Sequence, residues 1–211
     1  MTPPDRYDTS TLAEDQFEPG SDGTVMKNLL NITSREEMEI IETEHLWRAQ
    51  TQLLGEIEPD QKLTARELRA MHRLWLGPIY PWAGEYRQVN ISKSGFTFAM
   101  AHTIPSSMTT FEREQLGRHT PCQFASQDEI AHSLAEVHTE LMLIHPFREG
   151  NGRIGRLLAT LMGLQAGLPP LDFSDLAGES REEYFGAVRA GLDRDYRPMT
   201  KLFADVIRRS S

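Results

Sequence analysis

Apolar residues recur at helical spacing along most of this chain, and polar residues mark where the helices begin. At four places a serine or threonine is followed three positions later by a glutamate, so that hydroxyl and carboxylate can cap the free amides of a first helical turn. Apolar residues then repeat every three or four positions, which is typical of a helix with one buried face. The four predicted helix starts are Ser34 with Glu37, Thr64 with Glu67, Ser126 with Glu129, and Ser180 with Glu183.

Two further helices and one hairpin complete the predicted fold. A helix is expected over 151–165, and Pro198 suits the first turn of a last helix. Between 86 and 101, apolar positions alternate on either side of Lys93-Ser94-Gly95, which indicates a short β-hairpin with glycine in its turn. The sequence therefore predicts a mainly α-helical fold with a single small hairpin.

Composition separates the start of the chain from the rest and narrows the function. Residues 1–24 are polar and rich in Pro, Asp, Ser and Gly, so we expect 1–30 to form a partly irregular N-terminal arm and 31–209 to form one domain. The net charge of −9 argues against direct binding to nucleic acid or to an anionic membrane. A single cysteine, Cys122, excludes an internal disulfide framework and a thiolate zinc site.

The same sequence features bear on location. No stretch approaches the roughly 20 apolar residues of a membrane span. The residues after Met1 lack the basic-then-apolar pattern of a secretory signal. We therefore expect a cytoplasmic protein without a membrane partner, with delivery by a signal-independent export machine left open.

Candidate chemistry is concentrated in residues 145–156, His-Pro-Phe-Arg-Glu-Gly-Asn-Gly-Arg-Ile-Gly-Arg. His145 could accept a proton from an attacking hydroxyl, because imidazole titrates near neutrality; a helix-terminal histidine bonding a free carbonyl is the plainer alternative. Glu149 could hold Mg²⁺, which proteins usually bind with one or two carboxylates while phosphates and water supply the remaining ligands. By itself, Glu149 would be an exposed charge.

The remainder of this segment has the features of an anion site. Gly150-Asn151-Gly152 can point successive amides at one anion, and the positive end of the following helix adds to this attraction; an ordinary helix cap is the alternative. Arg153 and Arg156 are three positions apart, so both can lie on one helix face as planar phosphate ligands or as a solvated surface. Phe147 is most simply a core residue that fixes the loop.

The segment HPFREGNGRIGR resembles the signature of the Fic family, His-x-Phe-x-Asp/Glu-Gly-Asn-Gly-Arg-x-x-Arg, and matches it at every defined position. Tyr80–Arg87 is similar to the family's lead into its substrate-binding flap, and Tyr184–Pro198 is similar to its nucleotide-pocket region. The resemblance covers roughly residues 35–206. It implies a helical bundle with a hairpin flap, residues 86–101, over the active site.

Fic proteins commonly transfer AMP from ATP to a Ser, Thr or Tyr hydroxyl of a target protein. The resemblance implies that His145 is the general base, that Glu149 holds Mg²⁺, and that residues 150–152 bind the phosphate under attack. Arg153 and Arg156 would bind the outer phosphates of ATP.

The resemblance also assigns the flap and the adenine pocket. The flap residues next to the nucleotide would be Lys93, Ser94 and Gly95. Those that dock an extended target segment by strand addition would be Ser92, Lys93 and Phe96. Tyr184 would flank the adenine, although an aromatic residue at a helix start is more often part of the core. Leu192 stands where many relatives carry a polar residue.

Most relatives are restrained by a helix with the motif Ser/Thr-x-x-x-Glu-Gly/Asn, whose glutamate pairs with the second arginine of the signature. This chain holds two near matches that differ at the final position, Ser10…Glu14-Asp15 and Thr110…Glu114-Gln115. We therefore expect inhibition by a separate small antitoxin, which would make this chain the toxin-like half of a pair. Inhibition by Glu14 of the N-terminal arm is the weaker alternative.

Related activities are the alternatives to AMP transfer. Other branches of the family remove AMP from a modified target, move UMP or phosphocholine, or phosphorylate, and the phosphorylating branch has a cationic residue in place of Gly152. A catalytically inactive nucleotide-binding regulator is the alternative from another class. Bacterial relatives modify type II topoisomerase subunits or small GTPases, so a protein of either kind could be the target.

Overall fold

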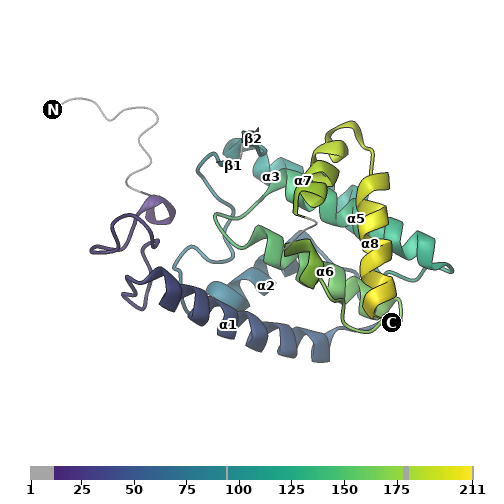
Figure 1. Cartoon of the computed structure of the whole chain (residues 1–211), viewed down its shortest axis with the longest axis horizontal. Coiled ribbons are helices and arrows are strands. Elements are labelled where there is room, and N and C mark those ends of the chain that lie inside the picture. Colours follow the sequence, from purple (N-terminus) through teal and green to yellow (C-terminus); the bar gives the residue numbers. More distant parts are fainter. Residues whose placement is uncertain (1–11, 94, 178–180, 211) are drawn as a thin grey trace.

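The structure, a computed structural model, describes residues 12–93, 95–177 and 181–210, which are mainly helical (Figure 1). The α-helices in chain order are α1 (Arg35–Glu56), α2 (Ala65–Leu76), α3 (Ile104–Phe111), α4 (Gly117–His119), α5 (Gln127–Ile144), α6 (Asn151–Gln165), α7 (Arg181–Ala190) and α8 (Arg197–Ser210). The short helical turns are η1 (Ala13–Asp15), η2 (Ala101–Thr103), the π-helical η3 (Glu112–Leu116), η4 (Ser174–Ala177) and η5 (Gly191–Asp193). The predicted fold class is confirmed.

The predicted caps explain where several helices begin. Complete capping boxes open α2 at Thr64 and α5 at Ser126, with each hydroxyl accepting the third amide and each glutamate returning a bond. At α1 the Ser34 hydroxyl accepts the Glu37 amide, while the hydroxyl itself donates to the neighbouring Glu36 carboxylate. Helix α7 begins directly after Ser180, which lies outside the described residues.

The hairpin is shorter than the alternating pattern predicted. Strands β1 (Ser92–Lys93) and β2 (Phe96–Thr97) are antiparallel, with Ser92 opposite Thr97 and Lys93 opposite Phe96. Gly95 has a φ of 76° and supplies the left-handed conformation of the turn, and Ser94 lies outside the described residues. The rest of the flap is irregular backbone, in which the Phe98 amide still donates to the Ile91 carbonyl at 3.2 Å and the Ala99 amide donates to the Leu143 carbonyl of α5 at 3.3 Å.

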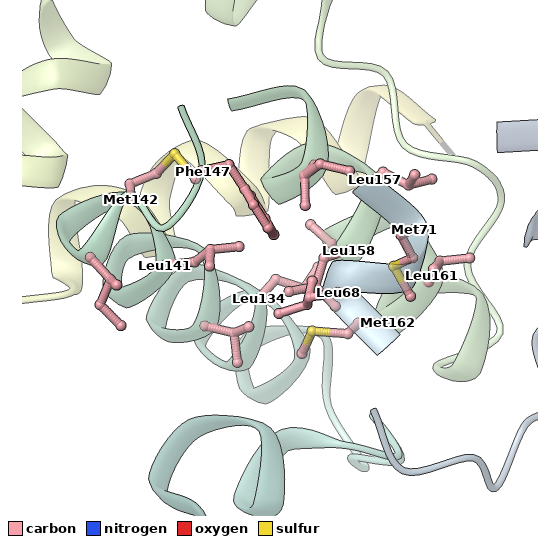
Figure 2. Close-up of a cluster of buried hydrophobic side chains, with 14 of the residues drawn as sticks. Leu68, Met71, Leu134, Leu141, Met142, Phe147, Leu157, Leu158, Leu161 and Met162 are labelled. Atoms are coloured by element: carbon pink, nitrogen blue, oxygen red, sulfur yellow. The ribbon is translucent and has the colours of Figure 1, made fainter. Parts of the chain in front are cut away.

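The two helices that flank the signature segment pack in the core. Helix α5 packs against α6 and α8, and α6 also contacts α1 and α2. Figure 2 shows Phe147, from the loop between α5 and α6, among leucine and methionine side chains of α2, α5 and α6. Leu68, Leu134, Phe147 and Leu158 are fully buried, and burial of each such side chain stabilises the fold by roughly 1.5–3 kcal/mol. Both ends of this loop (145–150, the α5–α6 loop) are therefore fixed by core packing.

The described part of the arm packs back onto the domain. A bridge pairs Phe17 with Met26, and the Leu29 amide donates to the Ile79 carbonyl at 2.8 Å. Across the described ranges, we find no helix with both the length and the apolar character needed to span a bilayer.

Candidate active site

His145 directly follows the last turn of α5 and has an uncommon backbone conformation. Its φ and ψ are 52° and 60°, the left-handed region, which few residues other than glycine adopt. Pro146 follows and disfavours continuation of the helix. The Arg87 Nε donates to the His145 carbonyl at 2.7 Å, and the Phe98 ring stacks on the imidazole with centroids 3.8 Å apart. The flap and a buried arginine thus fix both the backbone and the ring of His145.

The surroundings of His145 keep its imidazole neutral. Burial lowers its pKa to about 4, and the nearby charges of Arg87 and Lys93 act in the same direction. The Met142 carbonyl opposes this shift, although Nδ1 makes no hydrogen bond of standard geometry. At neutral pH the ring therefore has a free lone pair that can accept a proton.

The α5–α6 loop is held from inside by the side chain of Asn151. Its amide group donates to the Phe147 carbonyl at 2.8 Å, and its Oδ1 accepts the Phe147 amide at 2.9 Å. Asn151 is buried, so its side chain shapes the loop and its contribution to an anion site must come from the backbone. Gly150 has a φ of 81°, and a Cβ there would lie 2.6 Å from the Trp75 ring. Only glycine fits this position without displacing its neighbours.

His72 of α2 supports the same loop, a role that the sequence analysis did not predict. The Gly84 amide donates to Nδ1 at 2.8 Å, so Nε2 carries the proton and donates to the Glu149 carbonyl at 3.1 Å. The ring also stacks on Phe147, with centroids 4.0 Å apart. A polar residue at a core position of an apolar helix face was the available signal.

Glu149 is the exposed carboxylate of the loop. Its Oε1 accepts the Gly150 amide at 3.0 Å, and 48% of its side chain is exposed. The guanidinium of Arg153 lies 3.6 Å away, but its closer partner is Glu42 of α1 at 2.7 Å. Arg153 also lies over the Trp75 ring at 4.5 Å. Arg153 therefore links α6 to α1 and α2, which leaves only part of its guanidinium for a ligand.

Arg156 lies one turn further along α6 and is placed differently. In the described parts of the chain its half-buried guanidinium forms neither an ion pair nor a hydrogen bond. The start of α6 at Gly150 also lacks a side-chain cap, which leaves its first amides available. A Cβ at Gly152 would meet Arg156 at 3.6 Å, so the glycine borders this cation. Free amides and an unpaired cation form a site for a multiply charged anion.

Tyr184 borders this cation from α7. Its hydroxyl lies 2.9 Å from Nε2 of the buried His138, and burial raises the pKa of the phenol to about 12 while Arg156 opposes that rise. Leu192 is 64% exposed on the adjoining turn. The half-buried Tyr184 ring, which comes from the C-terminal part of the chain, therefore lies at the edge of the anion site.

The flap contributes a second edge. Ser92, Lys93 and Gly95 are exposed, Phe96 is half-buried against Phe98, and Lys93 is close enough to His145 to lower its pKa. Phe98 was missed as a site residue by the sequence analysis. Its alternation with Phe96 was the only available signal, because the contact with His145 spans 47 positions and depends on how the hairpin folds over α5.

Comparisons with known proteins agree with this geometry. Residues 62–162 match the model of the Fic/DOC family. Similar curated proteins include protein adenylyltransferase Fic of Culex quinquefasciatus, 29% identical over 153 residues, and protein adenylyltransferase VbhT of Bartonella schoenbuchensis, 28% identical over 166 residues. The matched regions are 70% and 77% of this chain but 28% and 34% of those proteins. The chain thus spans about a third of the length of the curated relatives it matches.

Solved structures show the same fold. The N-terminal Fic domain of a putative cell filamentation protein from Bartonella quintana is 27% identical with a TM-score of 0.71, covering 86% of this chain and 87% of that chain. BepC from Bartonella tribocorum, with bound AMPPNP, has a TM-score of 0.69 at 23% identity, covering 87% and 92%. The fold is that of a Fic domain, and residues 62–162 are similar to the Fic/DOC family. The curated relatives are named as enzymes that transfer adenylyl groups to proteins.

Proposed function

We propose that this protein is a protein adenylyltransferase that moves AMP from ATP to a Ser, Thr or Tyr hydroxyl of a target protein. The observation that carries the proposal is the pairing of a neutral His145 with an anion site formed by the uncapped start of α6 and the unpaired Arg156. The naming of the curated relatives, and the AMPPNP bound by BepC, support the same activity.

In the proposed reaction His145 removes the proton of the target hydroxyl. The hydroxyl oxygen forms a bond to the α-phosphorus of ATP, the bond from that phosphorus to the bridging oxygen breaks, and pyrophosphate leaves with the electron pair. Backbone amides of residues 150–152 stabilise the charge that develops on the phosphate under attack. Bound triphosphate would raise the pKa of His145, because nearby negative charge favours the imidazolium. Nucleotide binding therefore strengthens the base at the moment it is needed.

The other signature residues have supporting roles in this proposal. Arg156 binds the outer phosphates, and Arg153 contributes the part of its guanidinium that faces Glu149. Tyr184 flanks the adenine, at the edge of the site where the structure has its half-buried ring. On the flap, the nucleotide side is Lys93, Ser94 and Gly95, and the target side is Ser92, Lys93 and Phe96.

The donor set around Glu149 fits Mg²⁺. A single exposed carboxylate beside a phosphate site is the usual protein share of the ligands of this ion. Within the described ranges, no group of three or more His, Cys, Asp or Glu side chains could hold a metal, so phosphate and water oxygens must supply the other ligands. When bound, Mg²⁺ would offset negative charge on the triphosphate.

The partners follow from the chemistry proposed. The substrate is a protein with a modifiable hydroxyl, such as a type II topoisomerase subunit or a small GTPase, and a separate small antitoxin supplies an inhibitory glutamate to Arg156. We propose that the enzyme acts in a cytoplasm, without direct contact to nucleic acid. The Bartonella quintana relative is described as a VirB-translocated effector, so that cytoplasm could be that of another cell.

Labelled ATP provides the test. With cell lysate and ATP labelled on the α-phosphate, wild-type protein should label a lysate protein, and His145→Ala should reduce the rate by about 10²- to 10⁴-fold, the usual contribution of a general base. Equal labelling by both proteins would refute AMP transfer. Label that arrives only from the γ-phosphate would indicate phosphorylation instead; we do not expect it, because Gly152 leaves space beside Arg156.

A further inference from the structure

A buried arginine joins the base of the flap to the end of α5. Arg87 is 1% exposed, and its guanidinium donates to the carbonyls of Val89 at 2.6 Å and Ala99 at 2.5 Å, on the two stems of the hairpin. The same group donates to the carbonyls of Ile144 at 3.3 Å and His145 at 2.7 Å. One guanidinium therefore sets the position of the flap relative to the proposed base.

A carboxylate from the N-terminal arm offsets the charge of the buried Arg87. Its acceptors are neutral carbonyls, and burial lowers its pKa. The carboxylate that favours its charged form belongs to Glu14 of the N-terminal arm. Glu14 is 5% exposed, and its Oε1 accepts the amides of Gln88 at 2.6 Å and Val89 at 3.1 Å. Glu14 and Arg87 thus hold the backbone of Val89 from both sides, one at the amide and the other at the carbonyl.

A further contact fixes the arm at this place. The Arg148 Nε, from the α5–α6 loop, donates to the Glu14 carbonyl at 2.9 Å, and another nitrogen of Arg148 lies 3.7 Å from the Asp15 carboxylate. Burial raises the pKa of Glu14, and its hydrogen bonds to the Gln88 and Val89 amides and the charge of Arg148 offset part of that rise. The arm is therefore docked at the flap base by a specific polar contact.

We propose that Glu14 is a positioning residue for the flap, so that the N-terminal arm supports target modification and does not inhibit it. This inference rests on the proposed adenylyl transfer. Its physical content is that two amide bonds and one compensated charge keep the flap stems in place for an extended target segment. The Glu14 carboxylate binds the flap base and leaves Arg156 unpaired, in contrast to an inhibitory glutamate.

Hydrogen exchange of the full chain tests the positioning without any activity. In Glu14→Ala, amide exchange at Gln88 and Val89 should increase by about tenfold or more, because each amide loses a hydrogen bond to a charged group. Glu18→Ala is the matched control, since Glu18 lies in the same arm but binds the Asn28 amide at 3.1 Å. Equal exchange of residues 88–99 in both variants would overturn the proposal.

The dependence of activity on each substrate distinguishes a positioning role from a general loss of stability. The lysate concentration for half-maximal labelling should increase by about tenfold in Glu14→Ala, whereas the ATP concentration for half-maximal rate should change by less than about twofold. Unchanged dependence on lysate concentration, or faster labelling as expected for release of an inhibitor, would overturn the positioning role. If wild-type protein labels nothing, the proposed function fails, and the exchange measurement still decides whether Glu14 orders the flap.

Discussion

At the scale of single residues, the two arginines of the signature differ in a way their spacing does not reveal. Arg153 is paired with Glu42, whose side chain is 8% exposed and also accepts the Tyr80 hydroxyl at 2.8 Å. The guanidinium of Arg156 is unpaired within the described residues. The ion pair of Arg153 therefore stabilises the fold without a ligand. Arg156 gains a charged partner only when an anion binds.

This difference predicts opposite profiles for two alanine variants. Arg153→Ala should lower the free energy of unfolding by about 3 kcal/mol, because it leaves Glu42 buried without its cation. Arg156→Ala should leave that free energy within about 0.5 kcal/mol of wild type, yet weaken binding of a non-hydrolysable ATP analogue by about tenfold or more through loss of a phosphate contact. Urea denaturation and calorimetric titration measure the two quantities. Loss of stability in Arg156→Ala equal to that in Arg153→Ala would contradict this view.

At the scale of elements, the start of α6 joins folding to anion binding. The loop enters the helix through Gly150 at positive φ, and a Cβ there would approach the Trp75 ring to 2.6 Å. Two positions later, a Cβ at Gly152 would meet only the end of Arg156 at 3.6 Å. The first glycine is required by the backbone and by packing, and the second borders the ligand site.

Replacing each glycine by alanine should separate these roles. Gly150→Ala should lower the free energy of unfolding by about 2–4 kcal/mol, because left-handed strain adds to overpacking against Trp75. Gly152→Ala should have an effect below about 1 kcal/mol, since an alanine in the first turn of a helix is well tolerated. Equilibrium denaturation in urea checks both values. Comparable losses in the two variants would show that the Trp75 contact does not restrict residue 150.

Elements also show how far sequence reasoning extends. The starts of α2 and α5 were predictable because a capping box is local, and the signature segment was predictable because its residues are contiguous. His72, Arg87 and Phe98 reach the site from positions that are distant in the chain, so a local pattern could mark His72 or Phe98 as unusual but could not place any of the three at the site. The hairpin was predicted in place but not in length, because beyond Phe98 its backbone bonds to α5 instead of extending the ladder.

At the scale of the whole molecule, buried neutral histidines lie at the junctions of several helices. Burial lowers the pKa of His72, His138 and His145 to about 4 in each case. His138 of α5 is 2% exposed and faces Tyr184 of α7, Phe203 of α8 and the charge of Arg156 on α6. Protonating it would place a cation in the core beside another cation, so the packing of four helices depends on its neutral form.

The sign of the resulting pH dependence follows from linkage. The folded-state pKa of His138, about 4, lies below its ordinary value of 6.5, so the unfolded chain binds the proton first as the pH falls between these values. Stability is therefore lost as the pH decreases from 6.5 toward 4, and for one such group the loss at pH 5 is about 2 kcal/mol. His72 and His145 add losses of the same sign, which makes the protein acid-sensitive as a whole.

Replacing His138 by glutamine should reduce this dependence. The amide can still bond the Tyr184 hydroxyl, but it carries no proton equilibrium, so the fall in unfolding free energy from pH 7 to pH 5 should be smaller than in wild type by about 2 kcal/mol. Urea denaturation at both pH values gives the comparison, and His102→Gln, at an exposed position, is the control. Parallel pH profiles for wild type and His138→Gln would mean that other groups carry the acid sensitivity. A reduced dependence would assign it to the junction where α5, α6, α7 and α8 meet.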